Sequence, residues 1–175
     1  MIATVNDQPE ERSKGITMKR EDIVQSNVRR KRLQKVQIVS DLQCYGPCPE
    51  PDDVIEQRLT VSANGQVWFT EYLYGELGSK KHPVSRQARL SIGKDKSAAI
   101  LSLVADYCES YSMMIHCTDI GDWKLTATAP DGEKKRISGS LCGGIIVEDI
   151  DLTDYIREQI SIDNLAVFGG GEDWQ

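Results

Sequence analysis

The chain has 175 residues, of which 39% are hydrophobic and 6% aromatic, and its formal net charge is −6. This length and apolar content predict one globular domain with a buried core. No apolar run approaches the ~20 residues that cross a bilayer, and no apolar segment follows the first charges as it would in a secretory signal. We therefore expect a cytoplasmic protein without membrane contact.

The charge is distributed unevenly along the chain. Residues 19–35 hold seven Lys or Arg and two acidic residues, whereas residues 36–175 hold 12 basic and 22 acidic residues. A short basic segment is therefore followed by an acidic body. Such an asymmetry informs the choice of partner rather than the fold.

Two segments precede the first strand. Residues 1–17 show no apolar period and are rich in polar residues, which predicts a disordered extension. Thr17 is placed to cap a helix that runs to about Arg32, with acidic residues early and basic residues late, as the helix dipole favours. We expect a basic helix within residues 18–34.

The first half of the body favours strands. Residues 35–42 alternate in polarity, and residues 44–51 hold three prolines and a glycine, which predicts a loop. Residues 57–73 read as a β-hairpin, because Asn64-Gly65 is the preferred pair for a type I′ turn. Its second arm is apolar on both sides around Trp68, which predicts that both faces of this arm are covered.

The second half mixes strands with helices. Residues 86–92 alternate again, and residues 94–111 carry the apolar stripe of a helix. Asp106 and Glu109 oppose the dipole at the end of this helix, so we expect a compensating group nearby. A second hairpin is predicted for 122–139, a helix capped by Asp151 for 152–160, and a short closing strand for 165–168.

These elements predict an α+β fold. We expect a mainly antiparallel sheet of about six strands, made of two hairpins and additional strands, with helices packed on one face. The predicted domain spans residues 35–169, and a flexible tail spans 170–175.

The thiols offer the first candidate chemistry. The chain holds Cys44, Cys48, Cys108, Cys117 and Cys142, and an odd number argues for free thiols in a reducing compartment. Cys44 and Cys48 have the spacing of a zinc pair, but His116 and Cys117 are adjacent and suit one metal poorly. Small buried or loop thiols are the simpler interpretation, so no metal or other cofactor is expected.

Catalysis by the same residues has little support. Cys117 with His116 as base would form a nucleophilic pair, yet neighbours in a strand point to opposite faces. The glycines at 139–144 match no phosphate-binding or dinucleotide-binding motif. A metal- or thiol-dependent enzyme centred on Cys44, Cys48, His116 and Cys117 stays an alternative, but we expect no enzyme.

Charged side chains are the remaining candidates for a binding site. The basic run consists of Arg29, Arg30, Lys31 and Arg32, and the acidic group of Glu148, Asp149, Asp151, Asp154 and Glu158. Binding of nucleic acid by the whole domain is disfavoured by its negative charge, because such affinity comes largely from phosphate neutralisation. The acidic group would instead compete for a basic nucleic-acid groove.

Five short segments stand out: EQRLT (56–60), GQVWF (65–69), DIGDW (119–123), GSLC (139–142) and DLTDYIR (151–157). They resemble an uncharacterised family of small proteins from anaerobic Gram-positive gut bacteria and their mobile elements. The resemblance covers about residues 18–170 and marks core and turn positions. Small acidic proteins of mobile elements include anti-CRISPR proteins, so the resemblance suggests such an inhibitor by analogy.

The sequence therefore favours a non-enzymatic protein-binding module. Its partner would be a nuclease or another nucleic-acid-handling enzyme, which the acidic group would block. The basic helix would clamp the partner or touch its nucleic acid. A structural domain with neither activity remains a further alternative.

Overall fold

The computed structural model describes residues 32–44, 46–79, 81–111, 117 and 119–169. The predicted extension, residues 18–31 of the predicted basic helix and the tail lie outside these residues. Residues 32–34, the predicted end of that helix, are not helical. The described elements are β1 (Lys35–Asp41), β2 (Val54–Ser62), β3 (Gln66–Leu73), β4 (Val84–Ser91), α2 (Lys94–Ser110), β5 (Asp122–Thr128), β6 (Lys134–Ser140), β7 (Ile146–Val147), β8 (Ile150–Asp151) and α3 (Leu152–Gln159).

The six long strands form one antiparallel sheet in the order β4-β3-β2-β1-β5-β6, while β7 and β8 pair separately. The prediction of an α+β fold with a mainly antiparallel sheet is confirmed. None of the helices in the described ranges has the length and apolar character of a membrane span.

The turn between β2 and β3 depends on Gly65, but it is not the predicted type I′ turn, because only Gly65 and not Asn64 has a positive φ. The Gly65 φ of +86° is the left-handed conformation that glycine adopts readily, and a Cβ on it would lie 2.7 Å from the backbone of Gly93. The turn aligns the two arms so that Leu59 faces Phe69. Gly65 therefore fixes both the strand register and the approach of the chain that leads into α2.

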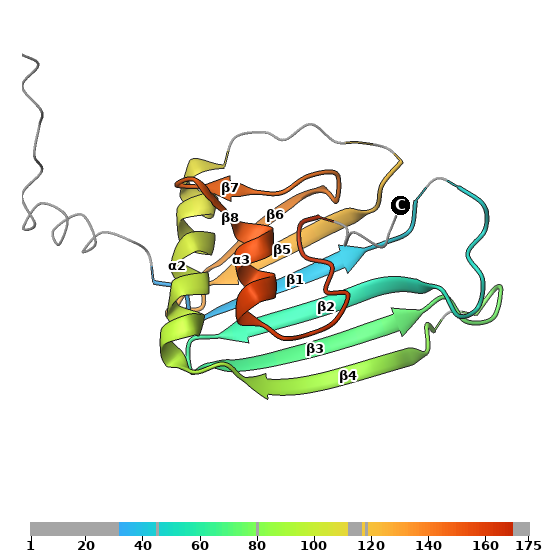
Figure 1. Cartoon of the computed structure of the whole chain (residues 1–175), viewed down its shortest axis with the longest axis horizontal. Coiled ribbons are helices and arrows are strands. Elements are labelled where there is room, and N and C mark those ends of the chain that lie inside the picture. The colour runs from blue at the N-terminus through green and yellow to red at the C-terminus, as the bar shows by residue number, and fades with distance from the viewer. Residues whose placement is uncertain (1–31, 45, 80, 112–116, 118, 170–175) are drawn as a thin grey trace, which may run out of the picture.

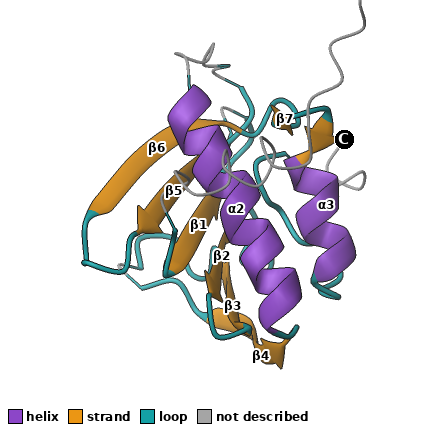
Figure 2. Ribbon diagram, turned by 90° about the vertical axis from the view of Figure 1, so that its left-hand side faces the viewer, coloured by secondary structure: helices purple, strands orange, loops and turns teal. Residues whose placement is uncertain are grey.

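The core lies between the sheet and the two helices. Alternation along β1 turns Val36 and Ile38 inward, and Ile100 of α2 and Ile156 of α3 are equally buried. Figures 1 and 2 show both helices on the same side of the sheet. The opposite side carries no described element, and we call it the open face.

The prediction that both faces of β3 are covered is wrong. Val67 and Phe69 are 0% and 1% exposed, but Trp68 between them is 36% exposed. Trp68 pairs with Thr60 on β2 and with Arg89 on β4, so it stands in a polar row on the open face. An indole ring tolerates such a half-exposed position because part of its surface packs on its neighbours.

A buried glutamine holds the chain that follows α3. Gln57 on β2 is 1% exposed, its amide nitrogen donates to the Asn164 carbonyl (2.9 Å), and its amide oxygen accepts from the Ala166 backbone N–H (2.8 Å). The hydroxyl of Ser40 donates to the Ala166 carbonyl (2.7 Å). Hydrogen bonds from the side chains of Gln57 and Ser40 therefore hold this segment. The strand predicted for residues 165–168 is not formed, and Val167 makes only an isolated β-bridge to Gly169.

Candidate functional site

The turn between β7 and β8 presents two of the predicted acidic residues. Val147 pairs with Ile150, so Glu148 and Asp149 are the two central residues of the turn. Their φ angles are +48° and +66°, the left-handed conformation in which a tight turn favours Asn or Gly. Holding a glutamate there costs backbone strain on the order of 1–3 kcal/mol. The turn therefore exposes two carboxylates on a strained backbone.

Apolar side chains flank these carboxylates. Ile146 and Ile150 are 63% and 38% exposed. Ile146 and Glu148 line an open hollow of about 460 Å³ together with Asp106 and Glu109 from the last turns of α2. The hollow therefore combines an exposed isoleucine with carboxylates from two elements.

Helix α3 carries the other three predicted residues. Asp151 is its N-cap, and one carboxylate oxygen accepts from the backbone N–H of Thr153 (2.8 Å) and Asp154 (3.2 Å). Asp151 thus stabilises the helix start. Asp154 and Glu158 are exposed one turn apart, and Asp154 lies 3.8 Å from the Arg157 guanidinium.

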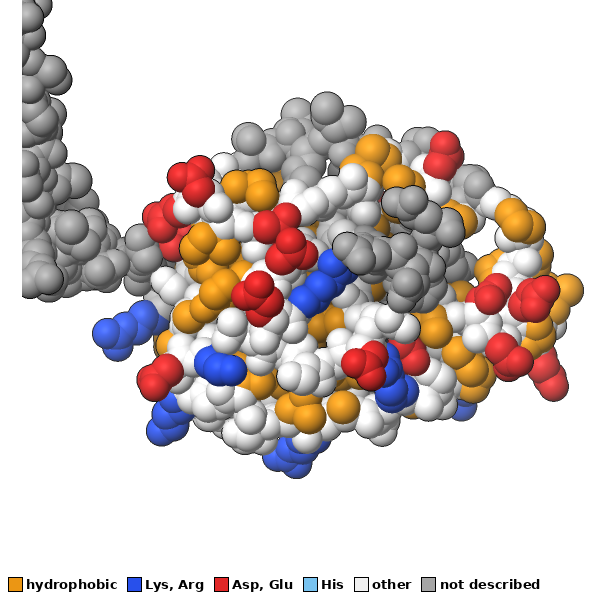
Figure 3. All heavy atoms as spheres, in the orientation of Figure 1, with side chains coloured by type: hydrophobic (Ala, Val, Ile, Leu, Met, Phe, Trp, Pro, Cys, Tyr) orange, Lys and Arg blue, Asp and Glu red, His pale blue; other side chains and the backbone are white. Residues whose placement is uncertain are grey.

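The exposed carboxylates of α2, α3 and the β7–β8 turn share one side of the molecule. Helix α2 contacts both α3 and β7, and α3 contacts β8. Figure 3 shows acidic side chains gathered over α3 and the β7–β8 hairpin. We call this set the acidic surface: Glu109, Glu148, Asp149, Asp154 and Glu158.

A second group of carboxylates lies elsewhere. Glu50, Asp52 and Asp53 follow β1, Glu76 follows β3, and the two loops meet where the Gly75 backbone N–H donates to the Pro51 carbonyl. This group lies at the right of Figure 3, away from the acidic surface. This second group of carboxylates is therefore separate from the acidic surface.

Of the predicted basic run, only Arg32 belongs to the described residues, and it is exposed. Arg29, Arg30 and Lys31 lie outside them.

The thiols fall into separate places. Cys48 is in hydrogen-bonding contact with the Tyr74 hydroxyl (3.5 Å). Cys117 and Cys142 are free thiols in hydrogen-bonding contact. This contact, together with desolvation, raises the pKa of the Cys117 thiol above its ordinary value. A raised pKa lowers the thiolate fraction, which is opposite to the activation of a catalytic cysteine. His116 lies outside the described residues.

No three His, Cys, Asp or Glu side chains come together as a metal site requires, among the residues that the structure describes. Of the zinc set considered from the sequence, Cys44, Cys48, His116 and Cys117, the three described thiols do not come together as a metal site.

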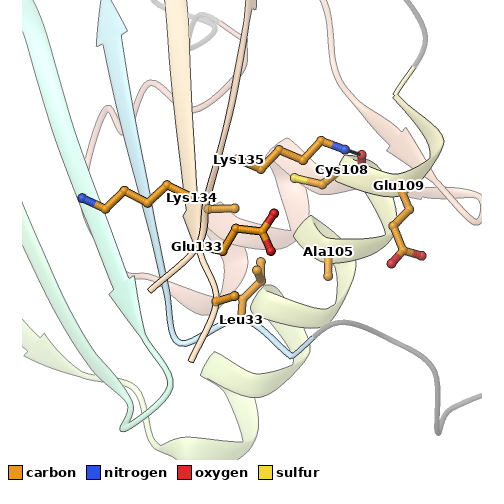
Figure 4. Close-up of a pocket in the computed structure, with 9 residues that line it drawn as sticks. Leu33, Ala105, Cys108, Glu109, Glu133, Lys134 and Lys135 are labelled. Atoms are coloured by element: carbon orange, nitrogen blue, oxygen red, sulfur yellow. Dashed lines mark hydrogen bonds between the residues drawn. The ribbon is translucent and has the colours of Figure 1, made fainter. Parts of the chain in front are cut away.

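A cavity of about 240 Å³ lies between α2 and the β5–β6 turn, lined by Leu33, Ala105 and Cys108 among others (Figure 4). The Lys135 ammonium donates to the Cys108 carbonyl near the end of α2. A cation at this position offsets the dipole and the acidic residues at the helix end, so Lys135 is the compensating group expected from the sequence. Burial also raises the pKa of the Cys108 thiol. Lys135, which lines this cavity, therefore stabilises the C-terminal end of α2.

The sequence did not reveal the open face of the sheet. It carries Trp68 and several basic residues from strands that are distant along the chain. Alternation within each strand indicates which residues share a face. The combined pattern, however, depends on the order of strands in the sheet, which a single sequence does not give.

The chain matches no protein-family model and no curated protein by sequence.

Proposed function

We propose that the protein is a non-enzymatic binding protein whose acidic surface occupies a basic surface on a partner protein. The partner would be a nuclease or another nucleic-acid-handling enzyme, of which an RNA-guided nuclease is one example. The observation that supports this most is the β7–β8 turn. It holds Glu148 and Asp149 in left-handed conformations beside the exposed side chain of Ile146.

Backbone strain of this kind is concentrated at functional sites, where the surrounding structure maintains it. An Asn-Gly turn would close the same hairpin with less strain. The strained pair instead places two negative charges at the tip. The presence of these charges on a strained turn supports a role in contacting a partner.

The composition of the surface favours a protein as the partner. Carboxylates repel phosphates, but they suit a groove that has evolved to bind phosphates. Ile146 and Ile150 would supply the apolar contacts that dominate the energy of protein interfaces. The surrounding carboxylates would mainly raise the association rate and select the partner.

Affinity capture with two charge-matched variants tests the proposal. The tagged protein is incubated with a lysate of the cells that carry its gene, and bound proteins are eluted with increasing salt. The test variant is E148K/D149K/D154K. The control variant, E50K/D52K/E76K, changes the net charge equally at the second acidic group.

We expect a nucleic-acid-handling enzyme to be retained by the wild-type protein and the control variant and lost by the test variant. Circular dichroism confirms that both variants are folded. Equal capture by both variants would contradict the proposal, and so would a specific partner without a basic surface.

A further inference from the structure

We propose that the open face of the sheet binds single-stranded nucleic acid. This inference is separate from the acidic surface and concerns the opposite side of the molecule. It rests on three observations: the charge of this face, the exposed ring of Trp68 and the arrangement of both on six adjacent strands.

The strand register places side chains of the open face in rows across the sheet. One row crosses all six strands and consists of Arg89, Trp68, Thr60, Gln37, Thr126 and Arg136. The next row consists of Gln87, Thr70, Arg58, Val39, Lys124 and Ser138. A third row lies on the other side of the first row. In it, Thr128 pairs with Lys35 on one neighbouring strand and with Lys134 on the other.

These three rows carry positive charge only. Their charged residues are Lys35, Arg58, Arg89, Lys124, Lys134 and Arg136, and all six are exposed. The acidic residues of this face are confined to a fourth row at the far end of the strands, where Asp41 pairs with Glu56 and Asp122. The basic part is therefore continuous across the width of the sheet.

Two aromatic rings of β3 belong to this face, and each is stacked with an arginine. The Arg89 guanidinium lies 5.6 Å from the centre of the Trp68 ring, and that of Arg58 lies 4.8 Å from the centre of the Tyr72 ring. Arg58 also forms an ion pair with Glu56 (2.5 Å). Tyr72 is half-buried and pairs with Glu56 in the acidic row. Nucleic-acid bases stack on both aromatic rings and guanidinium planes, so the Trp68–Arg89 pair in the basic part offers a platform for a base.

The combination of charge and rings selects a single strand. The bases of a duplex are stacked inside the helix and cannot reach a ring on a flat sheet. An acidic peptide would use the charges but not the rings. Six strands at ~4.8 Å spacing span ~24 Å, enough for several unpaired nucleotides, in keeping with single-strand site sizes of roughly 4–16 nucleotides.

The net charge of −6 does not oppose this inference. The acidic surface lies over the helices, on the opposite side of the sheet, and screening reduces the effect of exposed charges beyond about 10 Å at 0.1 M salt. A phosphate close to the open face would therefore be influenced mainly by the basic rows. The charges close to a bound phosphate determine its interaction energy, whereas the net charge of the protein mainly affects the electrostatic potential at a distance.

The test measures the fluorescence anisotropy of labelled 12-nucleotide dT and rU oligomers titrated with the full chain. A labelled duplex of the same length is the control. Both single strands, or one of them, should bind more tightly than the duplex. If three to six phosphates are neutralised, raising the salt from about 50 to 200 mM should weaken binding roughly 20- to 300-fold.

Variants separate the rings from the charges. W68A should weaken binding roughly 5- to 150-fold, because stacking contributes about 1–3 kcal/mol per base. K124E/R136E should also weaken binding strongly. K94E/K96E, which changes the same charge at exposed positions of α2, should leave affinity within about twofold, as expected for residues outside the contact.

Intrinsic fluorescence provides an independent measurement. A base stacked on Trp68 should quench its emission on binding, and W68F should lose that quenching while it still binds. Of the other two tryptophans, Trp123 is fully buried and reports only on folding, and Trp174 contributes equally to the wild-type protein and to W68F. If W68A fails to fold, W68F still tests the role of position 68, because it keeps an aromatic ring there.

Failure of both oligomers to bind at up to roughly 100 µM protein, the weak limit of non-specific affinity, would overturn the proposal. Equal loss in K94E/K96E and K124E/R136E would also overturn it. Displacement of dT by polyglutamate as effective as displacement by unlabelled dT would contradict it too, because the face would then recognise charge alone.

Discussion

Trp123 and Gly139 are cross-strand partners in the β5–β6 pair, and the indole ring of Trp123 occupies the space that a side chain at position 139 would need. A Cβ on Gly139 would lie 2.6 Å from the ring, which is shorter than any normal contact. The ring is fully buried, and its N–H donates to the Ser140 carbonyl (3.1 Å). The ring is therefore held in place.

Replacing Gly139 with alanine should lower the free energy of unfolding by roughly 1–3 kcal/mol, because the ring must move to admit the methyl group. Urea denaturation measures the change. Gly143→Ala is the control, since no atom lies within 4 Å of the corresponding Cβ. Equal stability of the two variants would show that the ring moves without cost.

The Gln57→Leu variant should lower the free energy of unfolding by roughly 2–4 kcal/mol. Leucine has a similar volume, but it leaves the buried Ala166 N–H and the Asn164 carbonyl without their partner, and each unpaired buried group costs about 1–3 kcal/mol. The same substitution at exposed Gln37 should change stability by less than about 0.5 kcal/mol. A loss at Gln57 no larger than at Gln37 would exclude this role.

The turn variant E148N/D149G should be more stable than the wild-type protein by about 1 kcal/mol, because Asn and Gly accept left-handed conformations with little strain. The same variant should bind the partner more weakly, because it lacks two carboxylates. Thermal denaturation and binding are measured on the same samples. Improved stability with undiminished binding would show that the strained turn does not serve recognition.

The pairing of Cys117 with Cys142 predicts an unusual pH dependence. Because this contact and desolvation raise the Cys117 pKa, less thiolate is present near pH 8 than in an ordinary cysteine. Cys142 is also an exposed thiol, so alkylation of Cys117 by iodoacetamide is followed by peptide mass spectrometry in a C44A/C48A background. It should accelerate only at higher pH. The C142A variant should move the profile to lower pH. An unchanged profile in C142A would mean that Cys142 does not cause the shift.

Local features of the sequence accounted for much of the fold. Alternation located the strand that contains Val36 and Ile38, Asn64-Gly65 located a turn, and Asp151 proved to be the cap of α3. Each of these signals depends on residues close together in the chain, which is why sequence alone was sufficient.

Features that depend on distant residues were not predicted. Gln57 resembles any polar residue of a strand until the chain at 164–166 lies against it. Trp68 and Arg89 become neighbours only through the register of β3 and β4. Charge counted along the chain also hides its separation in space, because the basic residues of the open face are interspersed with acidic ones in the sequence.

The association rate constant for the captured partner tests the central claim most directly. It is measured by biolayer interferometry at about 50 and 300 mM salt, a range over which screening of exposed charges increases markedly. We expect E148K/D149K/D154K to associate at least about tenfold more slowly than the wild-type protein at low salt, and the difference should shrink at high salt.

The control variant E50K/D52K/E76K should stay within about threefold of the wild-type rate, because its charges lie outside the contact. Equal slowing of both variants would show that only net charge matters, and unchanged association of the test variant would contradict binding through the acidic surface.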